Sequence, residues 1–349
     1  MDKIVNKETE VFGGGTLDHE NNISVLRILA CIMVIAIHVS SFYVINYAHN
    51  DGIEFIIGNL WDSFSRPAVP IFVMICGKYA LDNQNNSSIL KYYKKIFKRV
   101  YLITFLYSFL YTIYKYFFME KYTVKNLLNH WLAGEPFYHL WYLYMMIGIY
   151  LLVPFLIKLK NKIGEKKIKS LGIILLFLSF IIVLFRDFSE LANIAILKYY
   201  WKLNQFKFIN YLGYFILGYS LRNIKLEIKK GIIFSLVSGI ILFLTVQIFK
   251  SENEIIYDYN YPWVVIYSIF LYLTFLQLKI KKNKILVLAK YTFEVYLIHA
   301  FILLINIKYF DVIPIIFRIP LKIIIIFVTS LVIVIVSRNI KRRLKLNVI

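Results

Sequence analysis

Cysteine and acidic residues are scarce in this chain of 349 residues. It contains 2 Cys, and its 20 Asp and Glu are outnumbered by 41 Lys and Arg, which gives a formal net charge of +21. Cys31 and Cys76 both lie in apolar stretches and show no zinc-type spacing. This pattern excludes a disulfide framework and a cysteine-based zinc site, and we expect no metal cofactor.

Motifs of soluble enzymes are missing as well. The sequence has no GxSxG elbow, no Walker phosphate loop, no HExxH pair and no glycine-rich dinucleotide fingerprint in a suitable setting. It also has no internal repeat, and no hydrophilic segment is long enough to fold alone. We therefore expect any chemistry to take place within the apolar part of the chain or at its edge.

Apolar residues dominate what remains. Hydrophobic residues make up 60% of the sequence and aromatic residues 18%, and the mean hydropathy is +0.65. These residues come in blocks of about the length that crosses a ~30 Å hydrocarbon layer as a helix. We expect an all-α polytopic membrane protein with about ten transmembrane helices. The blocks cover residues 24–48, 61–81, 100–118, 136–157, 170–186, 207–221, 231–249, 260–278, 285–307 and 318–337.

The positive charge lies between these blocks, so it does not indicate a nucleic-acid-binding face. Alternate connections are strongly basic, whereas the others carry Asp51, Glu54, Glu252, Glu254 and Asp258. The positive-inside rule then places both termini and all basic connections in the cytoplasm. The basic connections are Lys91 to Arg99, Lys158 to Lys169, Arg222 to Lys230, Lys279 to Lys284 and Arg338 to Lys345.

The first apolar block, Ser24 to Ala48, is too long for the apolar region of a secretory signal and has no small-residue cleavage pattern after it. We interpret it as a retained helix. Residues 1–22, with three consecutive glycines, are expected to form a mobile cytoplasmic tail. Residues 23–349 are then a single membrane domain.

Two ionisable residues lie in this first helix, where such groups are costly and mark functional candidates. Arg27 lies near its cytoplasmic end, and His38 lies eleven residues further on. At 100° per residue the two side chains project from one face, about 16 Å apart along the axis. This arrangement suits a long anionic ligand. The alternatives are that Arg27 reaches lipid phosphates and that His38 bonds a neighbouring helix.

Five further candidates lie at similar depth or nearer the outside. Arg66 and His299 are the strongest, because an intramembrane arginine needs a partner or a water-filled cavity, and apolar residues surround His299. Trp141 and His139 can equally be interfacial residues. Glu294 lies in the same block as His299. The basic run from Lys91 to Arg99 has two readings, a topogenic segment that touches anionic lipid and a site for phosphates.

Five segments in order resemble the membrane acyltransferase 3 family, the bacterial integral-membrane O-acyltransferases that modify cell-surface glycans. The opening helix shows the family's Arg, ten residues, then His. The chain is most similar to the stand-alone type, which lacks a fused extracellular domain. The segments are Asn22 to His38, Ser65 to Gly77, His139 to Pro154, Tyr211 to Tyr219, and Tyr296 to His299.

The resemblance implies a cytoplasmic acyl-CoA donor, acetyl-CoA or another, and a cell-envelope glycan hydroxyl as acceptor, in the bacterial plasma membrane. It implies that His38 is catalytic, with Arg27 and Arg66 as its partners. Departures from the family pattern are Cys76 in place of Ser, Lys78 after Gly77, and Glu294 in place of a small residue. The implied substrate contacts are His139, Trp141, Glu294 and His299, and the implied donor-phosphate contacts are Lys95, Lys98 and Arg99.

Two other functions fit the same pattern. A polysaccharide or lipid-linked glycan transporter, or flippase, also needs polar groups near the midplane and basic inner loops. The absence of visible repeat symmetry speaks against it. The third possibility is a sensor or assembly protein without catalysis, which the altered residues Cys76 and Glu294 allow.

Overall fold

The computed structural model describes residues 21–48, 52–119, 123–191, 206–250, 256–305, 310 and 312–344, with the backbone alone for 186–191. Every regular element in these ranges is a helix, and each of the ten apolar blocks overlaps one. Residues 1–20 of the expected tail, and Asp51, Glu252 and Glu254, lie outside the described residues.

Six helical segments in the described part are long and apolar enough to cross a membrane, and a shorter apolar helix covers Pro262–Gln277. The chain is therefore a polytopic all-α membrane protein, as the sequence indicates. The six segments are Asn21–Tyr47, Ile89–Phe118, Trp141–Phe185, Ile228–Ile248, Lys284–Ile305 and Ile315–Arg343.

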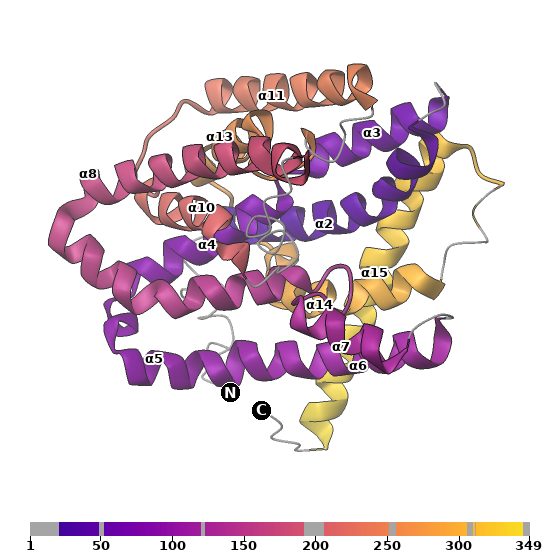
Figure 1. Ribbon diagram of the computed structural model, residues 1–349, viewed down its shortest axis with the longest axis horizontal. Coiled ribbons are helices and arrows are strands. Elements are labelled where there is room, and N and C mark those ends of the chain that lie inside the picture. Colours follow the sequence, from indigo (N-terminus) through magenta and orange to yellow (C-terminus); the bar gives the residue numbers. More distant parts are fainter. Residues whose placement is uncertain are drawn as a thin grey trace. The chain divides into compact units, whose positions relative to one another are not determined.

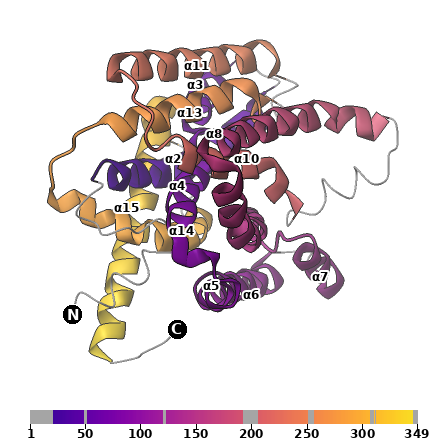
Figure 2. The same ribbon diagram turned by 90° about the vertical axis from the view of Figure 1, so that its left-hand side faces the viewer.

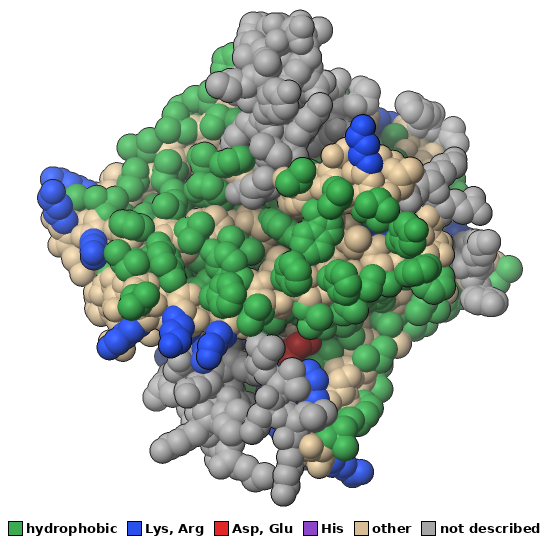
Figure 3. Space-filling model, turned by 60° about the horizontal axis from the view of Figure 1, so that its bottom comes forward, with side chains coloured by type: hydrophobic (Ala, Val, Ile, Leu, Met, Phe, Trp, Pro, Cys, Tyr) green, Lys and Arg blue, Asp and Glu red, His purple; other side chains and the backbone are tan. Residues whose placement is uncertain are grey.

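The surface agrees with a bilayer setting. Large apolar side chains are exposed along helices α6 (Leu102–Phe118) and α11 (Ile228–Ile248), among them Phe109, Phe117 and Ile233. On the face shown in Figure 3, apolar side chains cover most of the area, and Lys and Arg gather toward its margins. Lipid tails are the solvent that accommodates such a surface.

The described residues pack into two compact units. One unit comprises Val73–Leu221, and the other comprises the described parts of Gly15–Phe72 and Arg222–Val348. Helix α4 (Ala68–Asp82) begins in the second of these and continues into the first.

The unit of Gly15–Phe72 and Arg222–Val348 is centred on helix α2 (Asn21–Tyr47). Helix α2 packs against α3 (Ile53–Ser65), α14 (Thr292–Ile305) and α15 (Ile315–Arg343). Its apolar residues, including Ile35 and Val39, share a core with Val295 of α14 and Ile319 of α15. Helix α11 packs against α13 (Pro262–Gln277), and the 3-10 helix η5 (Lys284–Tyr291) precedes α14.

Side-chain amides join the start of α2 to the end of α13. The Nδ2 atom of Asn22 donates to the carbonyl of Phe275 at 2.8 Å, and that of Asn21 donates to the carbonyl of Ile280 at 2.9 Å. Phe275 lies in the last turn of α13, where carbonyls lack partners within the helix, and Ile280 lies just beyond that helix, so both bonds fix the end of α13 against α2.

The second apolar block is not one helix, which corrects the span of residues 61–81. Helix α3 begins earlier, at Ile53, and ends at Ser65, and α4 begins at Ala68. Pro67 lies at the break, where its missing amide hydrogen interrupts the ladder and its carbonyl accepts from Ile71 N at 2.9 Å. Arg66 is the cap residue of α3. The break therefore places Arg66 between two helices.

In the Val73–Leu221 unit, the basic run from Lys91 to Arg99 is helical, and not a loop as the charge pattern suggested. The 3-10 turn η1 (Gln84–Ser87) leads into α5 (Ile89–Ile96), the π-helical turn η2 (Phe97–Tyr101) and α6 without interruption. A helix α7 (Val124–Leu132) that the sequence analysis did not predict packs against α6. Figure 2 shows α7 beside α6. Between them, Trp131 Nε1 donates to Thr112 Oγ1 at 2.6 Å.

Helix α8 (Trp141–Leu191) covers the fourth and fifth apolar blocks and folds back sharply on itself (Figure 1). The reversal occurs at Gly164, with φ 82° and ψ 168°, a conformation that residues with a Cβ rarely adopt. The connection from Lys158 to Lys169, expected as a loop, is therefore helical on both sides of one glycine. Helix α10 (Phe208–Ser220) packs against α8.

Helices α4 and α10 approach each other through two glycines. A Cβ on Gly77 would lie 1.8 Å from the carbonyl oxygen of Phe215, and one on Gly218 would lie 2.0 Å from that of Met74. Both obstacles are backbone atoms, which cannot rotate away as a side chain does. Small residues at such crossings allow the close backbone packing that holds membrane helices together.

We predict that Gly77→Ala and Gly218→Ala each destabilise the protein by about 3 kcal/mol, because overpacking at backbone contacts forces the helices apart. Thermal unfolding in detergent measures this as a lower Tm. Gly52→Ala is the control, since its Cβ meets the flexible end of Glu54 at 3.1 Å. Equal Tm values for all three variants and the wild type would contradict the packing argument.

Candidate functional site

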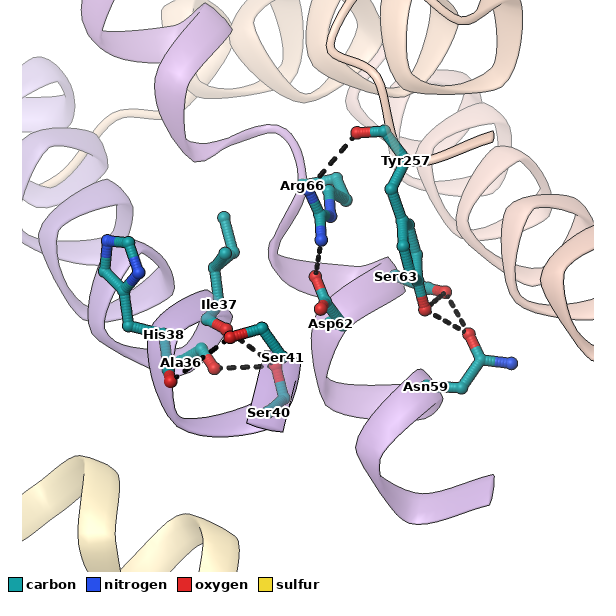
Figure 4. Close-up of polar contacts among 10 residues, drawn as sticks. All are labelled: Ala36, Ile37, His38, Ser40, Ser41, Asn59, Asp62, Ser63, Arg66 and Tyr257. Atoms are coloured by element: carbon teal, nitrogen blue, oxygen red, sulfur yellow. Dashed lines mark hydrogen bonds and ion pairs between the residues drawn. The ribbon is translucent and has the colours of Figure 1, made fainter. Parts of the chain in front are cut away.

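Arg27 and His38 both belong to α2, which runs without interruption from Asn21 to Tyr47. The unbroken helix keeps their side chains on one face, as the spacing predicted. Arg27 is 6% exposed, and His38 is partly buried. The Ser41 hydroxyl donates to the His38 carbonyl at 3.3 Å, and the Ser40 hydroxyl donates to that of Ala36 at 2.7 Å (Figure 4).

His38 stacks on His299 of α14. Their ring centroids are 5.3 Å apart, and the ring planes differ by 26°. His299 has no exposed surface, and its Nδ1 lies 2.6 Å from the carbonyl oxygen of Tyr296. A carbonyl oxygen only accepts, so this Nδ1 carries the hydrogen, which leaves Nε2 as the acceptor of the neutral ring. The fold thus brings together two histidines that are far apart in the sequence.

Arg66 lies in a polar cluster on the side of α3. Its Nη2 is 2.6 Å from Asp62 Oδ1, and its Nη1 donates to the carbonyl of Tyr257 at 3.2 Å. Its guanidinium also lies over the Tyr257 ring, 4.1 Å from the centroid. The Asp62 side chain has no exposed surface, and that of Arg66 is 13% exposed. Figure 4 shows Asp62 and Tyr257 on different sides of the guanidinium.

A second layer of polar groups holds Tyr257. Its hydroxyl donates to Asn59 Oδ1 at 2.6 Å, and the Ser63 hydroxyl donates to the same oxygen at 2.8 Å. Asn59 Nδ2 in turn donates to the Phe243 carbonyl at 3.1 Å and to Gln247 Oε1 at 3.2 Å. The network therefore links α3 to α11 and to the segment before α13.

Helix α2, which carries His38, packs against α3, which ends beside Arg66, and against α14, which carries His299. Within the unit of Gly15–Phe72 and Arg222–Val348, the fold therefore brings three of the predicted residues onto neighbouring helices, and His38 and His299 into direct contact. Their chemistry is complementary. An imidazole accepts or donates a proton, and a guanidinium stabilises an oxygen that becomes negative.

His139 and Trp141 lie in the Val73–Leu221 unit. His139 is 1% exposed, and three aromatic rings surround it edge to face, those of Tyr111, Phe137 and Tyr138. Trp141 packs on Tyr211, with a centroid distance of 5.8 Å. Packing accounts for both positions, and their predicted contact with substrate stays a prediction.

The predicted phosphate-binding residues lie at the α5 end of the long helix in the same unit. Lys95 and Arg99 are partly buried, whereas Lys98 is exposed. Arg99 and Lys98 belong to the π-helical turn η2. Such turns are frequent at functional sites because they re-aim side chains within a helix. The turn keeps Lys95 and Arg99 partly buried while Lys98 points outward.

A family model described as an acyltransferase domain matches residues 20–338. The chain belongs to the acyltransferase 3 family. No curated protein and no solved structure matches the chain. The match includes residues of both compact units and confirms the resemblance found in the five segments. The protein is therefore a membrane-bound acyltransferase, and the family favours catalysis over the alternatives of transport and sensing.

Glu294 has a different environment in this acyltransferase from the one expected of a substrate contact. Its Oε1 accepts a hydrogen bond from Arg338 Nε at 2.7 Å and pairs with Arg338 Nη2 as well. The guanidinium of Arg338 also lies over the ring of Tyr291, 4.9 Å from its centroid. The contact joins α14 to the basic end of α15. Its evident role is to hold these two helices together.

Asp62 is the residue of this acyltransferase that sequence reasoning missed. The signal was present, because Asp62 precedes Arg66 by four residues, the spacing at which helical side chains meet. The sequence indicated that Arg66 needs a partner, and that partner lies one turn earlier on its own helix. Among the described residues, no group of three or more His, Cys, Asp or Glu lies close enough together to hold a metal ion.

Proposed function

We propose that this acyltransferase moves an acetyl or another short acyl group from cytoplasmic acyl-CoA to a hydroxyl of a cell-envelope glycan, in the bacterial plasma membrane. The observation that carries the proposal is the cluster of His38, His299 and Arg66. It combines an imidazole that can act as a base, a second imidazole stacked on it, and a cation at the end of a helix that packs against α2, the helix that also carries Arg27. Acyl transfer from a thioester uses a base for the acceptor proton and a group that stabilises the oxyanion, and these residues can supply both.

In the direct route, His38 takes the proton of the acceptor hydroxyl while the hydroxyl oxygen attacks the thioester carbon. A C–O bond forms, the C–S bond breaks, and the proton passes from the imidazolium to the departing thiolate. Arg66 or His299 stabilises the oxyanion of the tetrahedral intermediate. In the alternative route a nitrogen of His38 attacks the thioester carbon, a C–N bond forms, the C–S bond breaks and coenzyme A leaves as its thiolate. The acceptor hydroxyl then attacks the acyl-imidazole, a C–O bond forms, the C–N bond breaks, and the hydroxyl proton passes to the thiolate. Arg66 or His299 stabilises the oxyanion in both routes.

Donor binding is assigned to basic residues. Coenzyme A carries phosphates that guanidinium and ammonium groups recognise through charge-assisted hydrogen bonds. Arg27 lies near the start of α2, and Lys95, Lys98 and Arg99 lie near the start of the α5–α6 helix. Among the last three, Lys95 and Arg99 are the better candidates because their side chains are partly enclosed.

Acceptor binding is assigned to His139 and Trp141 in the Val73–Leu221 unit and, separately, to Glu294 and His299 in the other unit. Aromatic and polar side chains of this kind suit a sugar, which presents hydroxyls and apolar C–H faces. In this scheme Glu294 contributes only through the carboxylate acceptor positions that its pairing with Arg338 does not use. The acyl group and the glycan are the two partners of the reaction, and no metal is needed for the chemistry as written.

His38→Ala is predicted to lower turnover by about 10²- to 10⁴-fold, the usual contribution of a general base. Acyl-CoA affinity should change by less than about tenfold, ~1.4 kcal/mol, because the phosphates are held elsewhere. Arg27→Ala should show the opposite balance and lose affinity first. Turnover with acetyl-CoA, calorimetric affinity and Tm are measured on the same purified samples.

A purely structural role for His38 predicts a different result. If His38 only links helices, the His38→Ala protein has a lower Tm but keeps its activity per folded molecule. Near-normal turnover would therefore remove the catalytic assignment. A wild-type protein that does not bind acetyl-CoA at all would favour a glycan transporter instead.

Replacing Lys95, Lys98 and Arg99 together with Gln is predicted to raise KM for acyl-CoA more than it lowers kcat, because binding charge that acts equally on ground and transition states is lost. The matched control replaces Lys162, Lys166 and Lys167, three exposed lysines of α8. An unchanged KM would assign the α5 cluster to orientation and lipid contact alone. Equal effects of both triple variants on KM would show that the net charge of the protein, and not the α5 cluster, determines KM.

The orientation that accompanies this function has ten spans, with both termini and the basic connections in the cytoplasm. Cysteines introduced at the exposed positions 162, 225 and 282 should resist a membrane-impermeant thiol reagent in intact cells, whereas one at Asp258 should react. The native Cys31 and Cys76 are 1% and 3% exposed, so we expect them to add little background labelling. Reaction at position 162 from outside would overturn this orientation.

A further inference from the structure

Asp62 has no place in the mechanism so far, yet its environment is unusual for a carboxylate. It has no exposed surface, and it lies in α3 one turn before the break at Arg66 and Pro67. One oxygen, Oδ1, is 2.6 Å from Arg66 Nη2. A carboxylate in this setting is stable only beside a cation, and Arg66 is the cation beside it.

Arg66 is held by groups that leave its guanidinium little freedom. Asp62 binds Nη2, the Tyr257 carbonyl binds Nη1, and the Tyr257 ring covers the guanidinium plane. Of these contacts, the one with Asp62 is both the shortest and the only one with opposite charge. Asp62 is therefore the group whose position decides where the guanidinium points.

The direction matters because His38 lies on α2, the helix against which α3 and its terminal Arg66 pack. Helices α2 and α3, which carry the two residues, pack against each other, and Figure 4 shows both side chains in the same region. Asn59, Ser63 and Tyr257 form a rigid support behind the pair rather than between it and the histidine.

We propose that Asp62 is a positioning residue of the acyl-transfer reaction, which holds the Arg66 guanidinium in the orientation that serves the reacting atoms beside His38. The inference rests on the proposed function of that histidine cluster. Asp62 does not touch the substrate and acts through Arg66. A purely structural role, as a link between α3 and Tyr257, is the competing explanation that the experiment must separate.

Asp62→Asn keeps the shape of the side chain and its ability to accept a hydrogen bond, but removes the charge. We expect kcat with acetyl-CoA to fall by between about tenfold and hundredfold, the cost of a misplaced reacting group. KM for acetyl-CoA should change by less than about twofold, because the phosphates bind elsewhere. Glu227→Gln is the control, since it breaks an exposed ion pair with Lys230 and should leave both constants unchanged.

A double-mutant cycle tests whether Asp62 acts through Arg66. Arg66→Gln removes a donor that stabilises the oxyanion and should cost about 10²- to 10³-fold in kcat. Adding Asp62→Asn to Arg66→Gln should cause no further loss, because its target is gone. Multiplicative losses would show that Asp62 acts independently and would overturn the proposal.

The exchange variant Asp62→Arg/Arg66→Asp covers the case in which Asp62→Asn does not fold. It keeps an ion pair between the same positions but moves the guanidinium by one helical turn. We expect a Tm close to that of the wild type with turnover still low. Recovery of both Tm and turnover would show that the pair is only structural.

Failure of this inference differs from failure of the proposed function. If the wild-type protein transfers the acyl group and Asp62→Asn does so equally well, the positioning role is wrong while the function stands. If the wild-type protein transfers from no acyl-CoA, the donor assignment itself is wrong.

Discussion

A charge surrounded by helices that face lipid must find its opposite charge or a full set of hydrogen bonds inside the protein, and this constraint shapes the polar cluster around Arg66. Asp62 and Arg66 satisfy it for each other at 2.6 Å. Removing one partner of such a buried pair costs about 3–5 kcal/mol, because the other charge remains buried. The pair lies at the end of α3, just before the break at Pro67 that separates α3 from α4.

The same constraint explains how the surrounding polar residues are connected. Tyr257, Asn59, Ser63 and Gln247 pass hydrogen bonds from one to the next, so each buried polar atom along this path meets a partner. At the other end of the unit, Asn22 satisfies the last carbonyls of α13. Glu294 and Arg338 form a second ion pair between α14 and α15. Polar contacts in this unit thus fix helix positions as well as chemistry.

Much of this could be predicted from the sequence, and the reasons for success and failure are physical. Hydropathy over about 20 residues finds helices because backbone groups in a bilayer must form their hydrogen bonds within the chain, which a helix achieves. The Arg27 to His38 spacing was informative because α2 is straight. Hydropathy does not show the break at Pro67, the extension of α5 through its lysines, or the bend at Gly164, because each depends on one residue or on a polar helical turn. Helix α7 was missed for the same reason.

The site was only partly predictable because its contacts cross the sequence. His38 and His299 were each identified from the cost of burying an imidazole, but their stacking depends on how α2 packs with α14. The Tyr257 contacts of Arg66 depend likewise on a segment 191 residues away. Asp62 is the exception, since its i, i+4 spacing to Arg66 is local and could have been read. Family membership supplied the reaction class, which no single contact reveals.

The stacking of the two histidines has a consequence for the reaction that neither ring has alone. The lone pair of an imidazole nitrogen lies in the ring plane, so a neighbour stacked on the ring face leaves that lone pair accessible. In the proposed mechanism, this packing, with 26° between the rings, holds the plane in which His38 would receive a proton or an acyl group and blocks neither event. His299 keeps its own orientation through the Tyr296 carbonyl. A base whose plane is set by packing needs little reorganisation when the hydroxyl arrives, and this kind of preorganisation is where enzymes gain most of their electrostatic advantage.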